Sequence, residues 1–180
     1  MTIFLIGFMG SGKTTIGKGL ANQLGCTFVD LDAQIELNED RSIAEIFRVK
    51  GEEYFRKIEQ KWLLNFNEKN VVVSVGGGTP CYHHNMNTIL TKGISVYLNL
   101  PIGMMAKRVM SSKTIRPLIE PYRNDWNQLL DVMTTLFNKR EPIYKQADII
   151  FEASNMFIRK RQLLANMVKL KSLEKSDLLK

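Results

Sequence analysis

The sequence predicts a parallel α/β fold, in which helices cover both faces of a single sheet. Short runs of apolar and β-branched residues alternate with longer segments of helical periodicity along the whole chain. Strands are expected at 3–6, 27–29, 71–75, 94–100 and 147–151. Parallel strands need crossover connections, which the helical segments between these runs supply. A chain of 180 residues is long enough for one domain with a sizeable core.

The first strand leads directly into a glycine-rich loop. Residues 7–14 read GFMGSGKT, the P-loop pattern G-x-x-x-x-G-K-T, and a helical segment follows at once. In this context, backbone N–H groups and a helix N-terminus form a cradle for phosphate. Lys13 adds a charge for the β- and γ-phosphates, and the Thr14 hydroxyl can ligate Mg²⁺. We expect ATP phosphates to be bound by Gly10, Ser11, Gly12, Lys13, Thr14 and Thr15.

Two acids stand at the end of the second strand. Asp30 and Asp32 are two residues apart, so strand alternation puts them on one side, where parallel sheets form their ligand crevice. Both carboxylates could therefore face the P-loop. Asp32 could equally cap the next helix, because Asp is a favoured N-cap residue. The residues alone leave both interpretations open.

A broken helical region follows the two acids. Ser42 and Glu45 have the spacing of a capping box, so a short helix is expected to start there and to end near Gly51. A longer helix is expected over 52–68, with Arg56 at the border of its apolar stripe. Such an arginine either extends to water or reaches into a cleft to hold an anion.

Three glycines, 76–78, follow the third strand and would let a ligand approach the backbone closely. Ser74 lies on this strand where P-loop proteins usually supply an acid for magnesium. Because Ser74 is not an acid, Asp30 is expected to supply the carboxylate for magnesium. Ser74 would assist through water.

Residues 111–125 are small, polar and interrupted by prolines, which is typical of a mobile lid. Arg116 in this segment is a candidate for neutralising charge in the transition state of phosphoryl transfer. The helix expected over 125–140 has an apolar stripe in phase with Arg140. A guanidinium on a buried face needs an anionic partner, either an internal acid or a bound carboxylate.

The net charge of +7 does not indicate a nucleic-acid partner, because residues 156–180 carry five of the seven charges in a terminal helix and tail. The segment 172–180 is expected to be a flexible tail. No apolar run approaches the ~20 residues of a membrane span, and no basic region precedes the first strand. Cys26 and Cys81 form no disulfide or metal pattern. A cytoplasmic protein without membrane contact is therefore expected.

Together, these motifs resemble the shikimate kinase family over about residues 3–170. The resemblance rests on the P-loop, Asp30-x-Asp32, Gly51-Glu52-x-x-Phe55-Arg56-x-x-Glu59, Ser74-x-Gly76-Gly77-Gly78, Arg116-Pro117-Leu118, and Arg140 with Tyr144. It implies an α/β P-loop kinase of the nucleoside-monophosphate-kinase type, with a five-stranded parallel sheet flanked by helices. The single kinase domain would span 1–180, with a substrate-binding subdomain at 31–60 and a lid at 111–125.

The resemblance also implies transfer of the γ-phosphoryl group of ATP to the 3-hydroxyl of shikimate, on the route to chorismate and aromatic amino acids. The products would be 3-phosphoshikimate and ADP, and Mg²⁺ would be the cofactor. The enzyme is expected to be a monomer. The implied catalytic residues are Lys13, Asp32 and Arg116, and the implied shikimate ligands are Asp32, Arg56, Gly77, Gly78 and Arg140. Arg116 and Ser154 would also contact ATP. Thr14 would ligate Mg²⁺, with Asp30 and Ser74 in the outer shell of the metal.

One position departs from the family pattern. Many members carry an arginine, stacked on adenine, seven residues before the lid arginine, where this chain has Val109 with Arg108 one step earlier. A gluconate kinase or a nucleoside-monophosphate kinase would share the P-loop. Neither would need three glycines together with two carboxylate-binding arginines. A GTPase would need an Asn-Lys-x-Asp sequence, which this chain lacks.

Overall fold

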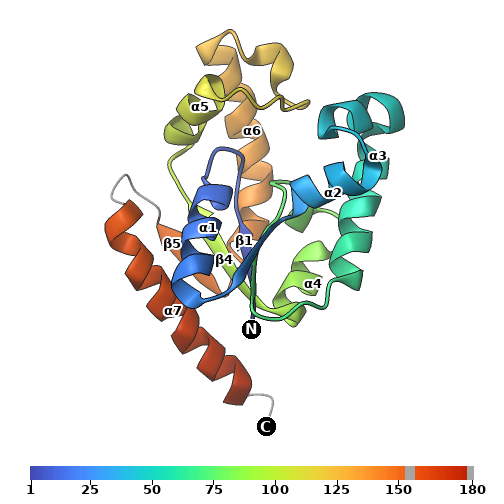
Figure 1. Ribbon diagram of the computed structural model, residues 1–180. Coiled ribbons are helices and arrows are strands. Elements are labelled where there is room, and N and C mark those ends of the chain that lie inside the picture. Colours follow the sequence, from blue (N-terminus) through green and yellow to red (C-terminus); the bar gives the residue numbers. More distant parts are fainter. Residues whose placement is uncertain (153–156, 178–180) are drawn as a thin grey trace.

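Five parallel strands form one sheet in a computed structural model that describes residues 1–152 and 157–177 (Figure 1). The strand order is β2–β3–β1–β4–β5, so β1 lies at the centre. The strands are β1 (Thr2–Ile6), β2 (Thr27–Asp30), β3 (Val71–Ser74), β4 (Ile94–Asn99) and β5 (Ile149–Glu152). The five-stranded parallel sheet is confirmed, and the P-loop leaves its middle strand.

Helices cover both sides of this sheet. They are α1 (Lys13–Leu24), α2 (Leu31–Glu39), α3 (Ile43–Asn65), α4 (Asn85–Lys92), α5 (Ile102–Ser111), α6 (Trp126–Tyr144) and α7 (Phe157–Asp177), with 3₁₀ turns η1 (Thr79–Cys81) and η2 (Glu120–Tyr122). Helices α1 and α7 pack together on one side, and α3 and α4 pack together on the other (Figure 1). The central strands are buried along their length, as continuous apolar runs predict.

Local capping signals define several helix ends. Gly25 ends α1 with a left-handed φ of 65°, and the capping box of Ser42 and Glu45 begins α3. Gly51, with a non-helical φ of 81° and ψ of 166°, lies at a kink between two helical halves of α3, which confirms the predicted break. The second half stops at Asn65, three residues before the predicted end.

Other predicted boundaries are also wrong. Strand β2 ends at Asp30, so Asp32 lies in the first turn of α2 and strand alternation does not apply to it. Helix α6 continues through Pro142 to Tyr144, because buried side chains at Arg140 and Tyr144 keep packing the same face beyond the proline. Strand β5 starts at Ile149, two residues later than predicted.

The C-terminal region also differs from its prediction. Helix α7 extends to Asp177, so a tail does not begin at 172. Lys175 holds this end, because its Nζ donates to the carbonyls of Leu90 (3.1 Å) and Gly93 (2.8 Å) and to Asp148 Oδ2 (2.9 Å). Among the helices of 1–152 and 157–177, none has the length and apolar content needed to cross a membrane.

Candidate active site

The P-loop turns tightly between β1 and α1. Gly10 has a φ of 80°, and a Cβ there would lie 2.6 Å from the carbonyl oxygen of Met105, so the position requires glycine. Lys13 folds back over the loop, and its Nζ donates to the carbonyls of Gly7 (2.8 Å) and Phe8 (3.1 Å). The ammonium group therefore sits against the phosphate cradle that the sequence predicts.

Two adjoining cavities open beside the P-loop. The P-loop cavity, of about 320 Å³, is lined among others by Gly10, Gly12, Lys13, Thr15, Ser74 and Arg108. The arginine cavity, of about 400 Å³, is lined among others by Phe55, Arg56, Glu59, Gly78, Leu118 and Arg140. Both cavities are lined by Met9, Thr14, Asp30, Asp32, Gly77 and Arg116. Groups bound in the two cavities would therefore meet at this shared wall.

The predicted Mg²⁺ residues come together on the P-loop side of the wall. The Thr14 hydroxyl donates to Asp30 Oδ2 at 2.8 Å. Ser74, which is 3% exposed, pairs with Asp30 in the register of β2 and β3. These three side chains offer only oxygen atoms, which are the ligands that Mg²⁺ prefers. In the described part of the chain, no cluster of three or more His, Cys, Asp and Glu side chains is arranged to hold a metal.

Asp32 lies where the two cavities meet. Its Oδ1 is buried and has no hydrogen-bond partner among the described residues, and its side chain does not cap α2. Burial, followed by the charges of Glu59 and Asp30, raises the pKa of Asp32 to about 7. Burial also lowers the pKa of Lys13 to about 8. The site thus contains an acid and a base that titrate near neutrality, a property common at catalytic centres.

Arg56 is buried, so the alternative in which it extends to water is wrong. Its Nη1 lies 2.7 Å from Glu59 Oε2, and its Nη2 lies 2.8 Å from Glu52 Oε1. Glu59 is fully buried and also accepts a hydrogen bond from Thr79. These ion pairs hold the guanidinium at the wall of the arginine cavity.

Arg140 is 6% exposed, which confirms that it is in phase with the buried stripe of α6. Within the described residues it forms no ion pair with an acid, and the ring of Phe8 lies 5.8 Å from its Cζ. Arg140 faces the same cavity as Arg56. The hydroxyl of Tyr144, one turn later, donates to the carbonyl of Gly77 and so holds the triple-glycine segment.

Arg116 lies in the predicted lid and lines both cavities. Burial lowers the pKa of Arg116, and its Nη1 donates to the carbonyl of Thr114 at 3.2 Å. Residues 114–118 form one side of the arginine cavity. Arg116 therefore stands at the boundary between the two cavities.

Arg108 is a site residue that sequence reasoning missed. Its Nη1 donates to the carbonyl of Gly10 at 3.2 Å, and its side chain lines the P-loop cavity. Val109, the family's usual arginine position, is instead buried in the core. Helical phase could have revealed Arg108 as a site residue. Met105 and Val109 share the buried face of α5, and Arg108 lies off that face.

Two other predicted ATP ligands have different outcomes. Ser11 is fully buried, its amide donates to the carbonyl of Phe8 at 3.2 Å, and it is not among the described residues that line the P-loop cavity. Thr15 lines the P-loop cavity. Ser154 lies outside the described residues.

A P-loop on the central strand of a five-stranded parallel sheet, followed by crossover helices on both sides, defines a P-loop kinase of the nucleoside-monophosphate-kinase type. A gluconokinase from Sinorhizobium meliloti shares this fold, with a TM-score of 0.55 at 14% identity and coverage of 96% of each chain.

A sequence model of the shikimate kinase family matches residues 9–169. The shikimate kinase of Azobacteroides pseudotrichonymphae is 43% identical over 156 residues, which cover 86% of this chain and 91% of the relative. A crystal structure of shikimate kinase from Bacteroides thetaiotaomicron matches with a TM-score of 0.83 at 34% identity, covering 97% and 98% of the two chains. A structure of shikimate kinase from Acinetobacter baumannii in complex with shikimate matches with a TM-score of 0.78 at 33% identity. The match covers 99% of this chain and 95% of that chain. The chain belongs to the shikimate kinase family.

Proposed function

We propose that this chain transfers the γ-phosphoryl group of ATP to the 3-hydroxyl of shikimate, giving 3-phosphoshikimate and ADP. One observation carries the proposal. A cavity lined by two buried arginines shares a wall with the P-loop cavity, and Asp32 and Arg116 stand in that wall. An acid bound to the arginines would present its hydroxyl groups to a triphosphate in the P-loop.

The arginine cavity suits a small organic acid. Arg140 is buried without an acidic partner among the described residues, so a bound carboxylate would supply the missing negative charge. Arg56 lies on the same cavity and is fixed by Glu52 and Glu59. Gly77 and Gly78 complete this side with backbone that a ring can approach. We assign Arg56 and Arg140 to the shikimate carboxylate.

The chemistry would take place at the shared wall. Asp32 would accept the proton of the attacking hydroxyl, since a pKa of about 7 suits a base that works near neutral pH. Lys13 and Arg116 would neutralise the charge that develops on the transferred phosphoryl group. Phosphoryl transfer asks little covalent chemistry of the protein, so most of the rate enhancement would come from positioning and charge.

The oxygen atoms of Thr14, Asp30 and Ser74 fit Mg²⁺, which usually binds one or two carboxylate or hydroxyl groups, waters and substrate phosphates. Bound there, Mg²⁺ would supply positive charge beside the phosphates of ATP. Thr14 would be a direct ligand, and Asp30 and Ser74 would act in the outer shell.

The proposal includes a lid at 111–125 and a substrate-binding subdomain at 31–60. It also includes action as a monomer, because residues of one chain line both cavities. The proposed location is the cytoplasm, with neither nucleic acid nor a membrane as a partner.

A coupled assay of ADP release with shikimate, gluconate and nucleoside monophosphates as acceptors tests the proposal. Of these acceptors, we expect only shikimate to be phosphorylated. Gluconate is also a carboxylate, so it tests whether the cavity selects more than charge. Preference for gluconate or a nucleotide would contradict the proposal and favour another kinase of this fold.

A further inference from the structure

The edges of the Arg56 guanidinium are only partly used by the protein. Nε and Nη2 both donate to Glu52 Oε1, at 3.1 and 2.8 Å, and Nη1 donates to Glu59 Oε2 at 2.7 Å. A guanidinium has five N–H groups. Within the described residues, one N–H on each terminal nitrogen is therefore left without an acceptor. A pair of this kind matches the two oxygens of a carboxylate.

The face of the same guanidinium is covered by an aromatic ring. The ring centroid of Tyr82 lies 4.4 Å from Arg56 Cζ, nearer than the ring of Phe55 at 5.2 Å. A ring over the planar face attracts the cation without using any N–H group. The Tyr82 hydroxyl also donates to Glu52 Oε1 at 3.2 Å, the oxygen that accepts from Arg56. One side chain thus contacts both the guanidinium and the acid on its edge.

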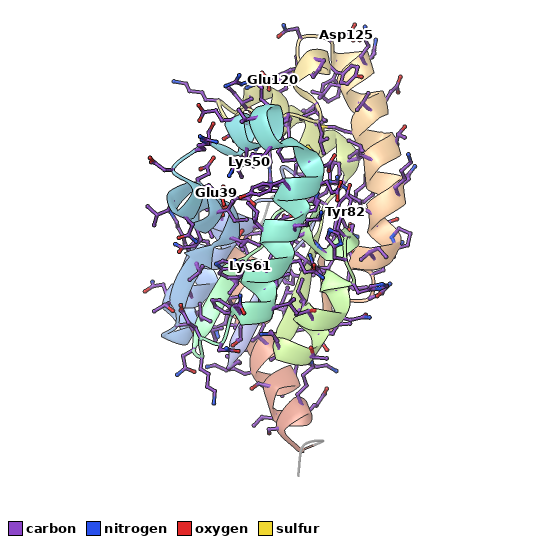
Figure 2. The ribbon with its side chains drawn as sticks, turned by 90° about the vertical axis from the view of Figure 1, so that its right-hand side faces the viewer. Glu39, Lys50, Lys61, Tyr82, Glu120 and Asp125 are labelled. Atoms are coloured by element: carbon purple, nitrogen blue, oxygen red, sulfur yellow. The ribbon has the colours of Figure 1, made fainter. Side chains whose placement is uncertain are left out.

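The backbone holds Tyr82 in this place. Tyr82 follows η1 directly, and Figure 2 shows it beside α3. The next two residues, His83 and His84, have φ values of 50° and 57°, a left-handed conformation that non-glycine residues rarely adopt. Gln60 Nε2 donates to the His83 carbonyl at 3.2 Å and ties this turn to α3. Contacts along α3 therefore maintain an unfavourable turn that sets the ring on Arg56.

We infer that Tyr82 is a positioning residue for the acceptor carboxylate. It fixes the plane of the Arg56 guanidinium, so that the two unused N–H groups face the arginine cavity. Tyr82 is not among the described residues that line this cavity, so it acts through Arg56. The inference deepens the proposed function and rests on its assignment of Arg56 to the carboxylate.

The test compares kcat, the KM for shikimate and the KM for ATP in the wild type, Tyr82→Phe and Tyr82→Leu. Loss of the ring in Tyr82→Leu should raise the KM for shikimate about tenfold, while kcat and the KM for ATP stay within about twofold of wild type. Tyr82→Phe keeps the ring and loses only the hydroxyl, so its KM should stay within about threefold. Thermal unfolding shows whether both variants are folded.

A neutral acceptor separates positioning from a general structural role. The methyl ester of shikimate carries no charge for Arg56 to bind, so Tyr82→Leu should leave kcat/KM for the ester unchanged. Tyr54→Leu is the matched control, because it removes a half-buried tyrosine of α3 whose hydroxyl contacts Glu39 and Lys50 instead. This control should leave the KM for shikimate unchanged.

Each other result overturns the inference. An unchanged KM in folded Tyr82→Leu, or equal losses with shikimate and its ester, would show that the ring does not serve the carboxylate. If Tyr82→Leu does not fold, Tyr82→Phe decides, because a rise in its KM for shikimate of more than about threefold would show that the ring alone does not position Arg56. If the wild type does not phosphorylate shikimate, the proposed function itself fails, and the inference with it.

Discussion

The hydroxyl of Thr14 donates a 2.8 Å hydrogen bond to Asp30 Oδ2, which joins the first turn of α1 to the end of β2. Asp30 also stands opposite Ser74 in the register of β2 and β3. The P-loop hydroxyl assigned to Mg²⁺ is therefore oriented by an acid from the neighbouring crossover unit. An acid that orients a metal ligand affects metal affinity without touching the metal.

Replacing this acid should change the Mg²⁺ requirement. We expect Asp30→Asn to raise the Mg²⁺ concentration for half-maximal activity at least about tenfold, because the Thr14 hydroxyl loses its charged acceptor. Activity measured across a Mg²⁺ titration at saturating ATP checks this. Asp40→Asn is the control, since Asp40 is an exposed C-cap with a φ of 49° that asparagine tolerates. An Mg²⁺ dependence that is equal in both variants and the wild type would exclude a role for Asp30.

The pKa values of Asp32 and Lys13 predict that activity falls on both sides of a maximum between about pH 7 and pH 8. Asp32, with a pKa of about 7, must be ionised to accept a proton, so kcat/KM for shikimate should fall as the pH drops below about 7. Lys13, with a pKa of about 8, must be charged to bind phosphate, so kcat/KM for ATP should fall above about 8. If both kcat/KM values stay constant between pH 6 and pH 9, the roles assigned to Asp32 and Lys13 are contradicted.

Asp32 should also affect stability, with a defined sign. Burial raises its pKa in the folded protein from 3.8, so its contribution to stability is fully present below pH 3.8 and is lost as the pH rises through about 7. Asparagine does not ionise, so the Asp32→Asn variant does not lose stability in this way as the pH rises. The Tm of the variant minus that of the wild type should therefore increase between pH 4 and pH 8. A Tm difference that is constant or decreases with pH would show that the pKa of Asp32 is not raised.

Gly78 gives a steric test of the arginine cavity. A Cβ at this position would lie 2.6 Å from Arg56 Nη1, and the ion pairs to Glu52 and Glu59 prevent an easy retreat of the guanidinium. We expect Gly78→Ala to raise the KM for shikimate at least about tenfold. Gly103→Ala, where a Cβ meets no atom within 4 Å, is the control and should behave as wild type. Steady-state kinetics on both variants measure this, and similar KM values would place the substrate elsewhere.

Lys175 should anchor α7 to the sheet. Lys175→Met removes three hydrogen bonds and leaves Asp148 without its cation, so the free energy of unfolding should fall by about 1–2 kcal/mol. Lys171→Met removes an exposed ion pair to Glu174, so it should lower the free energy of unfolding less than Lys175→Met does. Urea unfolding at pH 7 compares them. Equal losses would show that the end of α7 is not held by Lys175.

The central fold was predictable because its signals are local. The P-loop, the glycine that ends α1 and the capping box of α3 each depend on a few neighbouring residues. The burial of Arg140 was predictable from the phase of its helix. The acids around Arg56 stand three and four residues away on α3, a spacing that was visible in the sequence.

Other features depend on packing that sequence spacing does not determine. Leu163 and Leu170 are 54% and 63% exposed, because α7 buries Leu164 and Val168 instead. Adjacent leucines offer two possible faces, and contact with the sheet selects one of them. Asp32 lies in α2 because the chain turns into a helix directly after Asp30, a boundary that alternation cannot reveal.

The central claim is that two arginines, distant in sequence, bind one carboxylate opposite the P-loop. Calorimetric titration of shikimate into the wild type, Arg140→Ala and Lys139→Ala tests it most directly, since Lys139 is an exposed cation on the same helix. We predict that Arg140→Ala weakens binding by about 100-fold and that Lys139→Ala leaves it within about twofold. Equal affinity of Arg140→Ala and the wild type for shikimate would contradict the account.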